Sequence, residues 1–351
     1  MSEDRKLRAV IAVPLKEEHC ALIEELEPRL EVVRDHSLYY PMRIAADWAG
    51  DQSVKRSPEK QVEYEEMIDS ADLLFGIPDL DIASLKRTVD TNPNLRWVMT
   101  TLAGGGAQVK AADLSREQLE RVTVTTAAGI TGAPLAEFAL FGVLAGAKNL
   151  PKLQRDQKNH KWGGRWVMKQ LYDMTVLVVG LGGIGSECVT RFKAMGSKVW
   201  GASRSGRSVE GLDRALTPDQ LGDVMGEVDA IVITAPGTDS THHMISRDLL
   251  NKAKDGVIIA NVGRGTVIDE DAMIDSLRSG KIGFAALDVF TVEPLPEDSP
   301  LWDLENVLIC PHTSALNAGE EELMARRFAE NATNFIEGRP MSYTMDTTEF
   351  Y

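Results

Sequence analysis

The chain has 351 residues, enough for two domains with full hydrophobic cores, and 43% of them are hydrophobic, which is ordinary for a globular protein. A formal net charge of −15 argues against binding to nucleic acid, whose phosphates attract basic patches. No apolar run approaches the roughly 20 residues of a membrane-spanning helix, and the polar start Met1–Arg8 lacks the apolar core of a secretion signal. We therefore expect a cytoplasmic protein that acts neither on nucleic acid nor in a membrane.

Three cysteines, Cys20, Cys188 and Cys310, lie far apart in the chain, within or beside apolar segments. Their spacing matches neither a metal site nor a redox pair, for which close pairs of cysteines are typical. We therefore expect reduced, inert thiols in a cytosolic protein, and no metal site.

The first third of the chain shows an alternation of strands and helices. Short β-branched and aliphatic runs predict four strands, at Ala9–Pro14, Ala71–Phe75, Arg96–Thr100 and Val122–Thr126. A helix is predicted at Glu18–Glu27, between the first two. The segment Tyr39–Ser57 has mixed polarity and weak periodicity, which predicts an irregular loop. The pattern favours a small α/β domain with a mostly parallel sheet.

Two helices mark the limits of this domain. The first is predicted at Pro134–Asn149, because proline suits the first turn of a helix, where a missing N–H costs nothing. The second lies near Glu320–Glu337, with acids in its first turn and an apolar stripe along one side. With hinges near Gly129–Thr131 and Leu316–Ala318, we expect residues 1–130 and 317–351 to form one domain. Residues 131–316 would form a second domain inserted into it.

Between the two helices, six apolar runs predict a second sheet. The runs are Val176–Val179, Lys198–Ala202, Asp229–Thr234, Val257–Asn261, Phe284–Leu287 and Asn306–Cys310. Helix-length amphipathic segments such as Asp271–Ser279 separate them, which is typical of a doubly wound parallel sheet. Parallel sheets bind ligands at the carboxyl ends of their strands, so we expect the functional site along that edge.

A glycine-rich motif, Gly180-Leu181-Gly182-Gly183-Ile184-Gly185, follows the first of these strands and begins a helix that runs to about Met195. In this G-x-G-x-x-G pattern the first glycine permits a tight turn, the second lets the backbone approach a pyrophosphate, and the third allows the helix to pack closely on the strand. The helix N-terminus favours the negative charge. A plain glycine-rich turn is the alternative, but the strand–turn–helix context favours a dinucleotide.

Ser203 stands at the end of the next strand, where domains that prefer NAD carry Asp or Glu to bind the ribose hydroxyl. Arg204 follows it, and Arg207 is close by. A serine together with guanidinium groups can bind a 2′-phosphate, which a carboxylate would repel. The sequence therefore favours NADP(H), without excluding NAD(H). The alternative is that both arginines are solvated loop charges.

Arg264, Glu293 and His312 each follow a separate predicted strand. Glycines on both sides of Arg264 allow a tight turn that aims its guanidinium at a carboxylate, although a surface charge is equally consistent with this pattern. Reduction of a carbonyl by hydride puts negative charge on oxygen, so a proton donor that works near neutral pH is needed, and histidine is the natural choice. A carboxylate beside the ring would fix its tautomer and favour its protonated form. Taken singly, His312 could be structural and Glu293 a solvated charge; together on one edge, the three side chains favour hydride transfer.

At these positions the chain resembles the D-isomer-specific 2-hydroxyacid dehydrogenases. The matching motifs, in family order and spacing, are Gly180–Gly185, Asn261–Gly265 with Val267-Ile268-Asp269, Ala286–Phe290 with Glu293-Pro294, Pro300-Leu301-Trp302, and Pro311-His312. Ala127–Glu137 is similar to the helix that crosses between the family's domains. Trp200–Ser205, with Ser-Arg in place of the acidic residue, is similar to the NADPH-dependent glyoxylate/hydroxypyruvate reductase branch. The resemblance implies a flavodoxin-like substrate domain and a Rossmann cofactor domain, both doubly wound parallel-sheet domains of the α/β class, separated by a cleft.

The resemblance also implies roles for individual residues. Arg264 would bind the substrate carboxylate and the reacting oxygen, His312 would be the general acid/base, Glu293 would orient it, and Asp288 would hold the nicotinamide carboxamide. Backbone N–H groups for the substrate carboxylate would come from Ala103, Gly104 and Gly105. Further contacts to the cofactor would come from Ala235, Pro236, Val262, Gly263 and Ser314. A homodimer is implied too, with the crossing helix as a contributor.

One segment departs from the family pattern. The family commonly shows Gly-Val-Asp where this chain reads Gly104-Gly105-Gly106-Ala107. Three glycines form either a roomier anion nest or only a flexible turn. The pocket for the substrate side chain would include Gly76–Pro78 and Tyr39–Trp48, whose geometry the sequence does not reveal, so the sequence does not name the 2-oxoacid.

We therefore expect a cytoplasmic oxidoreductase in which NADPH delivers hydride to the keto carbon of a 2-oxoacid while His312 protonates the oxygen, giving a D-2-hydroxyacid. Two alternatives stay open. Formate and phosphite dehydrogenases resemble this chain too, although formate enzymes carry Gln where Glu293 stands. The same fold also serves as a dinucleotide-sensing transcriptional co-repressor, which would bind partner peptides and turn over 2-oxoacids poorly.

Overall fold

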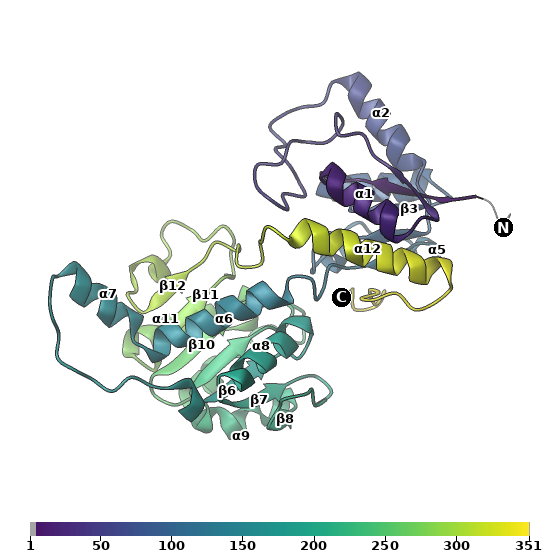
Figure 1. The fold of residues 1–351 in the computed structure, drawn as a ribbon. Coiled ribbons are helices and arrows are strands. Elements are labelled where there is room, and N and C mark those ends of the chain that lie inside the picture. Colours follow the sequence, from purple (N-terminus) through teal and green to yellow (C-terminus); the bar gives the residue numbers. More distant parts are fainter. Residues whose placement is uncertain (1–4, 351) are drawn as a thin grey trace. The chain divides into compact units, whose positions relative to one another are not determined.

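In the computed structural model, which describes residues 5–350, the chain forms two α/β units (Figure 1). One unit combines the residues up to Thr131 with those from Leu316 onward, and Gly132–Ala315 form the other. Each unit has its own sheet, in which every pair of neighbouring strands is parallel. The predicted class, two parallel-sheet α/β domains, is therefore confirmed.

The sheet of the first unit has the strand order β2-β1-β3-β4-β5. Its strands are β1 (Leu7–Ile11), β2 (Leu30–Val33), β3 (Leu73–Phe75), β4 (Trp97–Met99) and β5 (Thr123–Thr125). The four predicted strands are present, with bounds that differ by a few residues. β2 is not among the predicted strands, because a four-residue edge strand with an exposed Glu31 gives little apolar signal.

Helices cover both faces of this sheet. On one face lie α1 (Glu17–Leu26) and α12 (Glu320–Ile336), which are side by side in Figure 1. On the other lie α2 (Pro58–Asp69), α3 (Ile82–Thr91) and α4 (Gly106–Ala111), and α5 (Arg116–Arg121) follows α4. Trp97 stacks on Phe328 of α12 with ring centroids 4.7 Å apart, so the C-terminal helix completes the core of the first unit.

The predicted irregular loop Tyr39–Ser57 contains no helix or strand and is held by Arg56. The guanidinium of Arg56 donates to both carboxylate oxygens of Asp79, each at 2.7 Å. It also lies over the rings of Tyr40 and Tyr64, 4.2 and 3.8 Å from their centroids. Charge-assisted bonds and cation–π contacts together tie the end of this loop to the segment that follows β3.

The sheet of the second unit has the strand order β12-β11-β10-β9-β6-β7-β8. Its strands are β6 (Thr175–Val179), β7 (Lys198–Ala202), β8 (Arg214–Leu216), β9 (Ala230–Ile233), β10 (Val257–Asn261), β11 (Ile282–Leu287) and β12 (Val307–Ile309). All six predicted strands are present. β8 is not among the predicted strands, because its three residues are too few to show a period.

Alternate residues along these strands pack on opposite faces of the sheet. Val176 and Val178 face α6 (Gly132–Ala147) and α8 (Gly183–Ala194), and Leu177 faces the opposite layer. That opposite layer consists of α9 (Leu221–Val224), α10 (Arg247–Lys252) and α11 (Glu270–Ser279). Because both faces are buried, the strands read as continuous apolar runs. The sheet order reverses between β6 and β9, which is where doubly wound sheets bind ligands.

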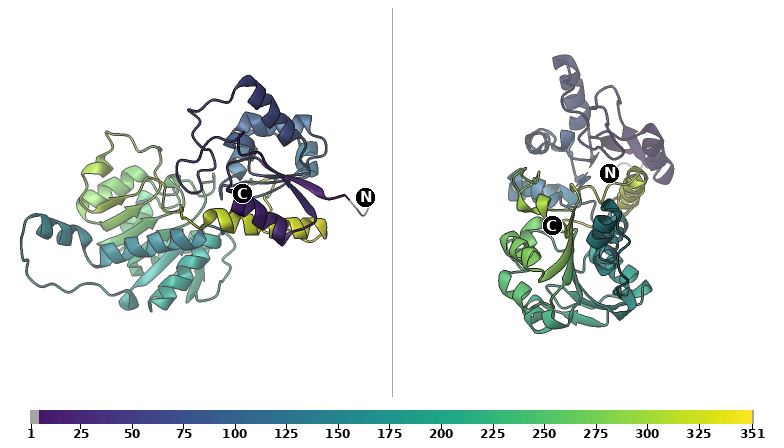
Figure 2. Two further views of the ribbon diagram at one scale, coloured as in Figure 1. Left: turned by 45° about the horizontal axis from the view of Figure 1, so that its top comes forward. Right: turned by 90° about the vertical axis from the view of Figure 1, so that its left-hand side faces the viewer.

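The second unit also carries an arm. It consists of α7 (Leu150–Lys158) and the chain from there to β6, and it extends from the body of this unit in Figure 1 and in the left view of Figure 2. Short 3₁₀ helices complete the secondary structure: η1 (Pro78–Leu80), η2 (Leu171–Asp173), η3 (Pro218–Gln220), η4 (Met225–Glu227), η5 (Gly265–Val267) and η6 (Pro300–Asp303). Among residues 5–350, no helix has both the length and the apolar character that a membrane crossing needs.

Candidate active site

The glycine motif lies between β6 and α8, and each of its glycines meets a different neighbour. Gly180 has a φ of +102°, and a Cβ there would lie 2.7 Å from the backbone nitrogen of Ala235. A Cβ at Gly185 would lie 1.9 Å from the carbonyl oxygen of Gly180. A Cβ at Gly182 would meet nothing within 4 Å, so the backbone at the start of α8 faces open space. The space and the helix N-terminus fit a pyrophosphate.

Ser203 directly follows β7, and its hydroxyl oxygen is buried without a hydrogen-bond partner among the described residues. A buried polar atom left without a partner is costly, which favours a ligand at this point. Arg207 donates to the carbonyl oxygen of Leu181, so its guanidinium lies across the glycine motif. Arg204 is exposed beside Ser203. The structure thus brings Ser203 and Arg207 to the strand ends that carry the glycine motif.

The ends of β9 and β10 approach each other by their backbones. A Cβ at Gly263 would lie 2.6 Å from the carbonyl oxygen of Ala235, and Thr234 Oγ1 donates to the Gly180 carbonyl at 2.6 Å. Ala235 and Val262 are buried, whereas Pro236 is exposed. The backbones and buried side chains of Ala235 and Val262 therefore pack at the carboxyl ends of β9 and β10, beside the glycine motif.

His312 and Glu293 form a hydrogen bond, with His312 Nδ1 and Glu293 Oε2 2.7 Å apart. The other oxygen of Glu293 accepts the backbone N–H of Phe290 at 2.9 Å, which fixes the carboxylate. His312 follows β12 and has a φ of +51°, a left-handed conformation that a non-glycine residue adopts only when its surroundings hold it there. The imidazole is about half exposed.

Asp288 holds the loop that carries His312. Its carboxylate is fully buried and accepts the N–H groups of Thr313 and Ser314 at 3.0 and 3.1 Å and the hydroxyl of Ser314 at 2.6 Å. Both oxygens are thus taken by this loop. The geometry assigns Asp288 and Ser314 to supporting the loop, and direct contacts with the cofactor stay a prediction.

Arg264 is exposed in the turn between β10 and η5. Asn261, which begins the Asn261–Gly265 motif, has a role that is not among the predictions: it is fully buried and holds this turn. Its Oδ1 accepts the Gly263 N–H and its Nδ2 donates to the Arg264 carbonyl, both at 3.1 Å. An amide at the end of an otherwise apolar strand was the available signal. Arg264 itself donates to the Gly263 carbonyl at 2.7 Å, which turns its side chain back along the turn.

The predicted substrate loop lies in the first unit, between β4 and α4. Ala103 and Gly104 are exposed, whereas Gly105 is buried and donates its N–H to the Leu102 carbonyl at 3.1 Å. Within residues 5–350, the N–H groups of Ala103 and Gly104 donate to no backbone carbonyl. The amide of Gly105 is thus occupied within the loop, and binding of the substrate by Ala103, Gly104 and Gly105 stays a prediction.

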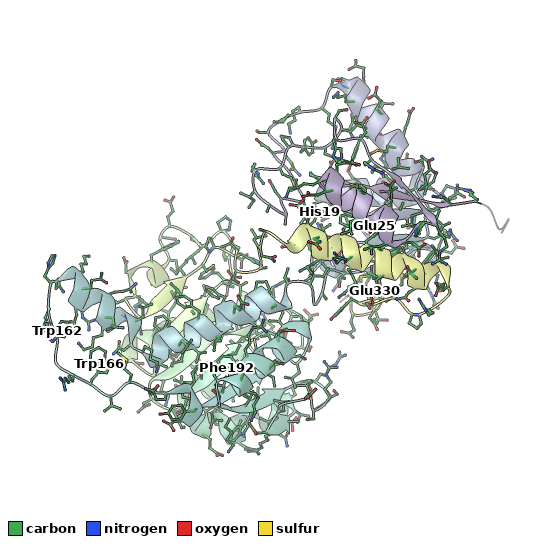
Figure 3. All side chains as sticks on the ribbon, in the orientation of Figure 1. His19, Glu25, Trp162, Trp166, Phe192 and Glu330 are labelled. Atoms are coloured by element: carbon green, nitrogen blue, oxygen red, sulfur yellow. The ribbon has the colours of Figure 1, made fainter. Side chains whose placement is uncertain are left out.

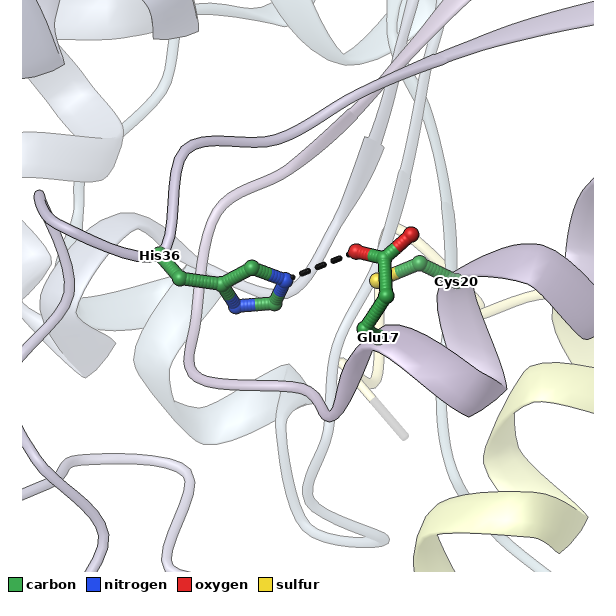
Figure 4. A group of neighbouring side chains, drawn as sticks. All are labelled: Glu17, Cys20 and His36. Carbon is green, nitrogen blue, oxygen red and sulfur yellow. Dashed lines mark hydrogen bonds and ion pairs between the residues drawn. The ribbon is translucent and has the colours of Figure 1, made fainter.

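One cluster elsewhere in the first unit has the residue types of a metal site. Figure 4 shows Glu17, Cys20 and His36, whose ligand atoms lie within 4.8 Å of one another. However, the Glu17 carboxylate accepts from Arg34 at 2.5 and 3.2 Å and from His36 at 2.9 Å, which lowers the pKa of this carboxyl to about 2. Burial raises the pKa of the Cys20 thiol to about 12. A carboxylate occupied by a guanidinium and a protonated thiol make this an ion-pair cluster.

The other two cysteines are free thiols as well. Burial raises the pKa of Cys188 to about 12 and that of Cys310 to about 11, with the Asp288 carboxylate adding to the shift at Cys310. A thiolate is the reactive form of cysteine, so these pKa values describe inert thiols at neutral pH.

All the site residues of the second unit follow carboxyl ends of strands in one parallel sheet, as expected: the glycine motif follows β6, Ser203 β7, Ala235 β9, Arg264 β10, Glu293 β11 and His312 β12. Residues 140–314 match the family model of the D-isomer specific 2-hydroxyacid dehydrogenase NAD binding domain. A hydroxypyruvate reductase of Thermotoga maritima is 30% identical over 281 residues, which cover 76% of this chain and 89% of that protein. The chain belongs to the D-isomer-specific 2-hydroxyacid dehydrogenase family.

The chain is also similar to other members of this family. A glyoxylate reductase of Korarchaeum cryptofilum is 29% identical over 286 residues, covering 80% of this chain and 84% of that protein. A D-isomer specific 2-hydroxyacid dehydrogenase of Xanthobacter autotrophicus, solved in complex with NADPH and MES, aligns with a TM-score of 0.77 at 27% identity over 99% of this chain and all of that one. The chain is thus an NAD(P)-dependent 2-hydroxyacid dehydrogenase that is similar, over most of its length, to a glyoxylate reductase and a hydroxypyruvate reductase.

Proposed function

We propose that this family member uses NADPH to reduce a 2-oxoacid to the D-2-hydroxyacid. The observation that carries the proposal is the 2.7 Å bond between His312 and Glu293, at the sheet edge that also bears the glycine motif. When bound, NADPH supplies the hydride that the keto carbon accepts. The substrate oxygen then gains negative charge and takes a proton, so one 2-oxoacid, one NADPH and one proton give one hydroxyacid and one NADP⁺.

His312 is the proton donor in this proposal, and Glu293 is its positioning residue. Because Glu293 accepts at Nδ1, the ring carries a proton there, and the Nε2 edge is the one that donates to the substrate oxygen. The carboxylate also stabilises the imidazolium before the proton is transferred. Phe290 holds the second carboxylate oxygen, so the pair keeps its orientation without help from substrate.

Arg264 supplies the positive charge that a 2-oxoacid needs. A guanidinium can bind a carboxylate with two parallel hydrogen bonds and can polarise the adjacent carbonyl oxygen. The turn that presents it is fixed by Asn261 and by glycines on both sides. In the first unit, the N–H groups of Ala103 and Gly104 would bind the substrate carboxylate.

A preference for NADPH over NADH rests on Ser203. Its buried hydroxyl has no partner in the part of the chain that the structure describes, and no carboxylate stands at the end of β7 to repel a 2′-phosphate. Arg207, which already lies across the glycine motif, and Arg204 supply positive charge in the same loop. The Xanthobacter relative solved with NADPH supports this choice.

The decisive experiment is a substrate panel with absorbance of the reduced cofactor as the readout. Glyoxylate, hydroxypyruvate and other 2-oxoacids are each assayed with NADPH and with NADH, and formate and phosphite are assayed with the oxidised cofactors. We expect turnover of 2-oxoacids with NADPH. Hydroxypyruvate and other acids whose keto carbon bears a carbon substituent should give a product of D configuration, whereas the glycolate formed from glyoxylate is achiral. Arg264→Lys, which keeps the charge but loses the planar fork, should raise KM and lower kcat, leaving NADPH affinity unchanged. Cofactor binding without turnover of any acid would instead indicate a sensing protein.

A homodimer is the second part of the proposal. Trp162 and Val167 on the arm are fully exposed, and Figure 3 shows Trp162 and Trp166 on this arm. Phe141 on α6 is half exposed as well. A second copy of this chain could cover both arms at once by two-fold symmetry. Light scattering should report a dimer, and Trp162→Ser with Val167→Ser should shift it toward monomer; a monomeric parent protein would refute this. A cytoplasmic location is also part of the proposal, and the three free cysteines agree with it.

A further inference from the structure

The segment that follows α12 returns to the sheet of the first unit. Met345 donates its N–H to the Val124 carbonyl at 2.9 Å, and Thr126 donates to the Tyr343 carbonyl at 3.0 Å. Thr344 thereby forms an antiparallel bridge with Thr125 of β5, the edge strand of this sheet. The segment 342–350, which we call the strap, therefore covers an edge that would otherwise present unpaired backbone groups.

The far end of the strap is anchored beside the substrate loop. Phe350 packs against the apolar cluster that includes Val109 of α4 and Val124 of β5. Its N–H donates to the Asp346 carbonyl at 2.8 Å, and the Asp346 side chain accepts the N–H groups of Thr348 and Glu349 at 2.7 and 2.9 Å. These bonds close the end of the strap into a compact turn. Its position is thus set by its own hydrogen bonds and by apolar packing.

The contact between the strap and the loop is made at Gly106. A Cβ at this residue would lie 1.9 Å from the carbonyl oxygen of Phe350 and 3.3 Å from Met345 Sδ. Gly106 is also the first residue of α4. The strap therefore reaches the point at which the substrate loop becomes a helix, and only glycine leaves room for it there.

The opposite side of the same loop is pinned by Thr100. A Cβ at Gly105 would lie 2.1 Å from Thr100 Oγ1, and that hydroxyl donates to the Leu102 carbonyl at 2.9 Å. Two neighbouring glycines are thus required by two different neighbours, Thr100 on one side and Phe350 on the other. This accounts for the glycines that stand where the family commonly has Val-Asp: the extra space is filled by the chain itself and does not leave a loose turn.

We propose that the strap sets the conformation of the substrate loop and that Phe350 is a positioning residue for it. The inference rests on the proposed function, in which the N–H groups of Ala103 and Gly104 bind the substrate carboxylate. A backbone nest binds an anion only if its successive N–H groups converge on the same point. Small displacements of a group that binds the substrate lower the reaction rate strongly. The tail of the chain is then a specificity element of the first unit, although it lies far from this loop in sequence.

Three variants test the strap. Phe350→Ala removes the apolar anchor, Gly106→Ala pushes the Phe350 carbonyl away, and Glu349→Ala changes an exposed side chain of the same turn and serves as the matched control. Far-UV circular dichroism and thermal unfolding establish that each variant is folded. Kinetics are measured with glyoxylate and hydroxypyruvate and NADPH, and amide hydrogen exchange is measured on the protein without ligands.

We expect Phe350→Ala and Gly106→Ala each to raise KM for the 2-oxoacid about tenfold, with kcat changed less than about threefold and NADPH affinity unchanged. The double variant should be no worse than the more severe single one, because both changes break one contact. Exchange at Gly105 and Ala107, whose N–H groups bond within the loop, should accelerate in both variants and not in Glu349→Ala.

The exchange measurement separates failure of this inference from failure of the proposed function. If the parent protein turns over no 2-oxoacid, the proposed function fails, and exchange at Gly105 and Ala107 still decides whether the strap orders the loop. Unchanged exchange in Phe350→Ala and Gly106→Ala overturns the inference. So does a loss confined to kcat with KM unchanged, or additive effects in the double variant.

Discussion

Gly265 touches the backbone of Phe290. A Cβ at residue 265 would lie 1.9 Å from the Phe290 carbonyl carbon, and the N–H of the same Phe290 donates to Glu293 at 2.9 Å. The turn that carries Arg264 and the loop that carries Glu293 therefore share one close contact. The close contact at Gly265 therefore fixes the turn of Arg264 relative to the loop of Glu293.

Gly265→Ala should damage turnover without damaging cofactor binding. The added methyl group would displace Phe290, and with it the carboxylate that orients His312. We expect kcat to fall about 100-fold, because small displacements of acid–base groups have effects of this size. Steady-state kinetics and titration of NADPH fluorescence measure the two quantities. Gly226→Ala, where a Cβ would make ordinary contact with Lys252 at 3.6 Å, is the control. An unchanged kcat in Gly265→Ala would contradict this account.

Glu293→Gln tests the orientation of the imidazole. The amide oxygen of glutamine can still accept the Phe290 N–H, but an NH₂ group then faces His312 Nδ1 and favours the tautomer with the proton on Nε2 in a neutral ring. The imidazolium also loses its stabilising charge. We expect kcat to fall about 100-fold or more, with little change in Tm. Glu297→Gln, in the same acidic loop, should retain full turnover. Equal kcat values for Glu293→Gln and Glu297→Gln would show that Glu293 has no role in the mechanism.

Ser203→Asp should reverse the cofactor preference. A carboxylate at the end of β7 would repel the 2′-phosphate of NADPH and would accept hydrogen bonds from the ribose hydroxyl of NADH. The ratio of kcat/KM for NADPH to that for NADH should fall by about 100-fold, mostly through weaker use of NADPH. Ser208→Asp, which adds the same charge at an exposed residue of this loop, should change the ratio far less. A ratio that both variants lower equally would point to net charge alone.

Glu27 should make the stability of the first unit depend on pH. Its carboxylate accepts from Arg29 at 2.6 and 2.7 Å and from Thr333 of α12 at 2.6 Å, and the bonds to Arg29 lower the pKa of this carboxyl from 4.5 to about 2. A lowered pKa stabilises the folded state fully above the ordinary value of 4.5, and this contribution is lost as the pH falls through about 2.

Glu27→Gln should therefore lower the free energy of unfolding by about 2 kcal/mol at neutral pH. The difference from the parent protein should shrink steadily as the pH falls from about 5 toward 2. Urea denaturation at a series of pH values measures it. Glu25→Gln is the control, because Glu25 is exposed on α1, the helix after which Glu27 follows (Figure 3). A difference that is constant with pH would show that the carboxylate contributes through packing and not through charge.

The sequence by itself determined the elements of the second unit and the order of its site residues. Continuous apolar runs such as Val257–Asn261 are characteristic of strands buried on both faces, and the glycine motif marks a strand–turn–helix unit by local backbone chemistry. These signals are local, so they can be read without coordinates. Short edge strands such as β2 and β8 escaped because their few residues show no period and gain stability only from the neighbour with which they pair.

Only the tertiary structure decided which atoms meet. Three contacts join residues that are distant in the chain, and their spacing gives no sign of contact. They are the bond between Glu293 and His312, the support of the histidine loop by Asp288, and the close approach of Phe350 to Gly106. The reason is physical: turn and strand preferences act over a few residues, whereas a hydrogen bond or a missing Cβ is set by the packing of whole elements. The sequence identified which side chains could perform the chemistry, and packing determined how they are held.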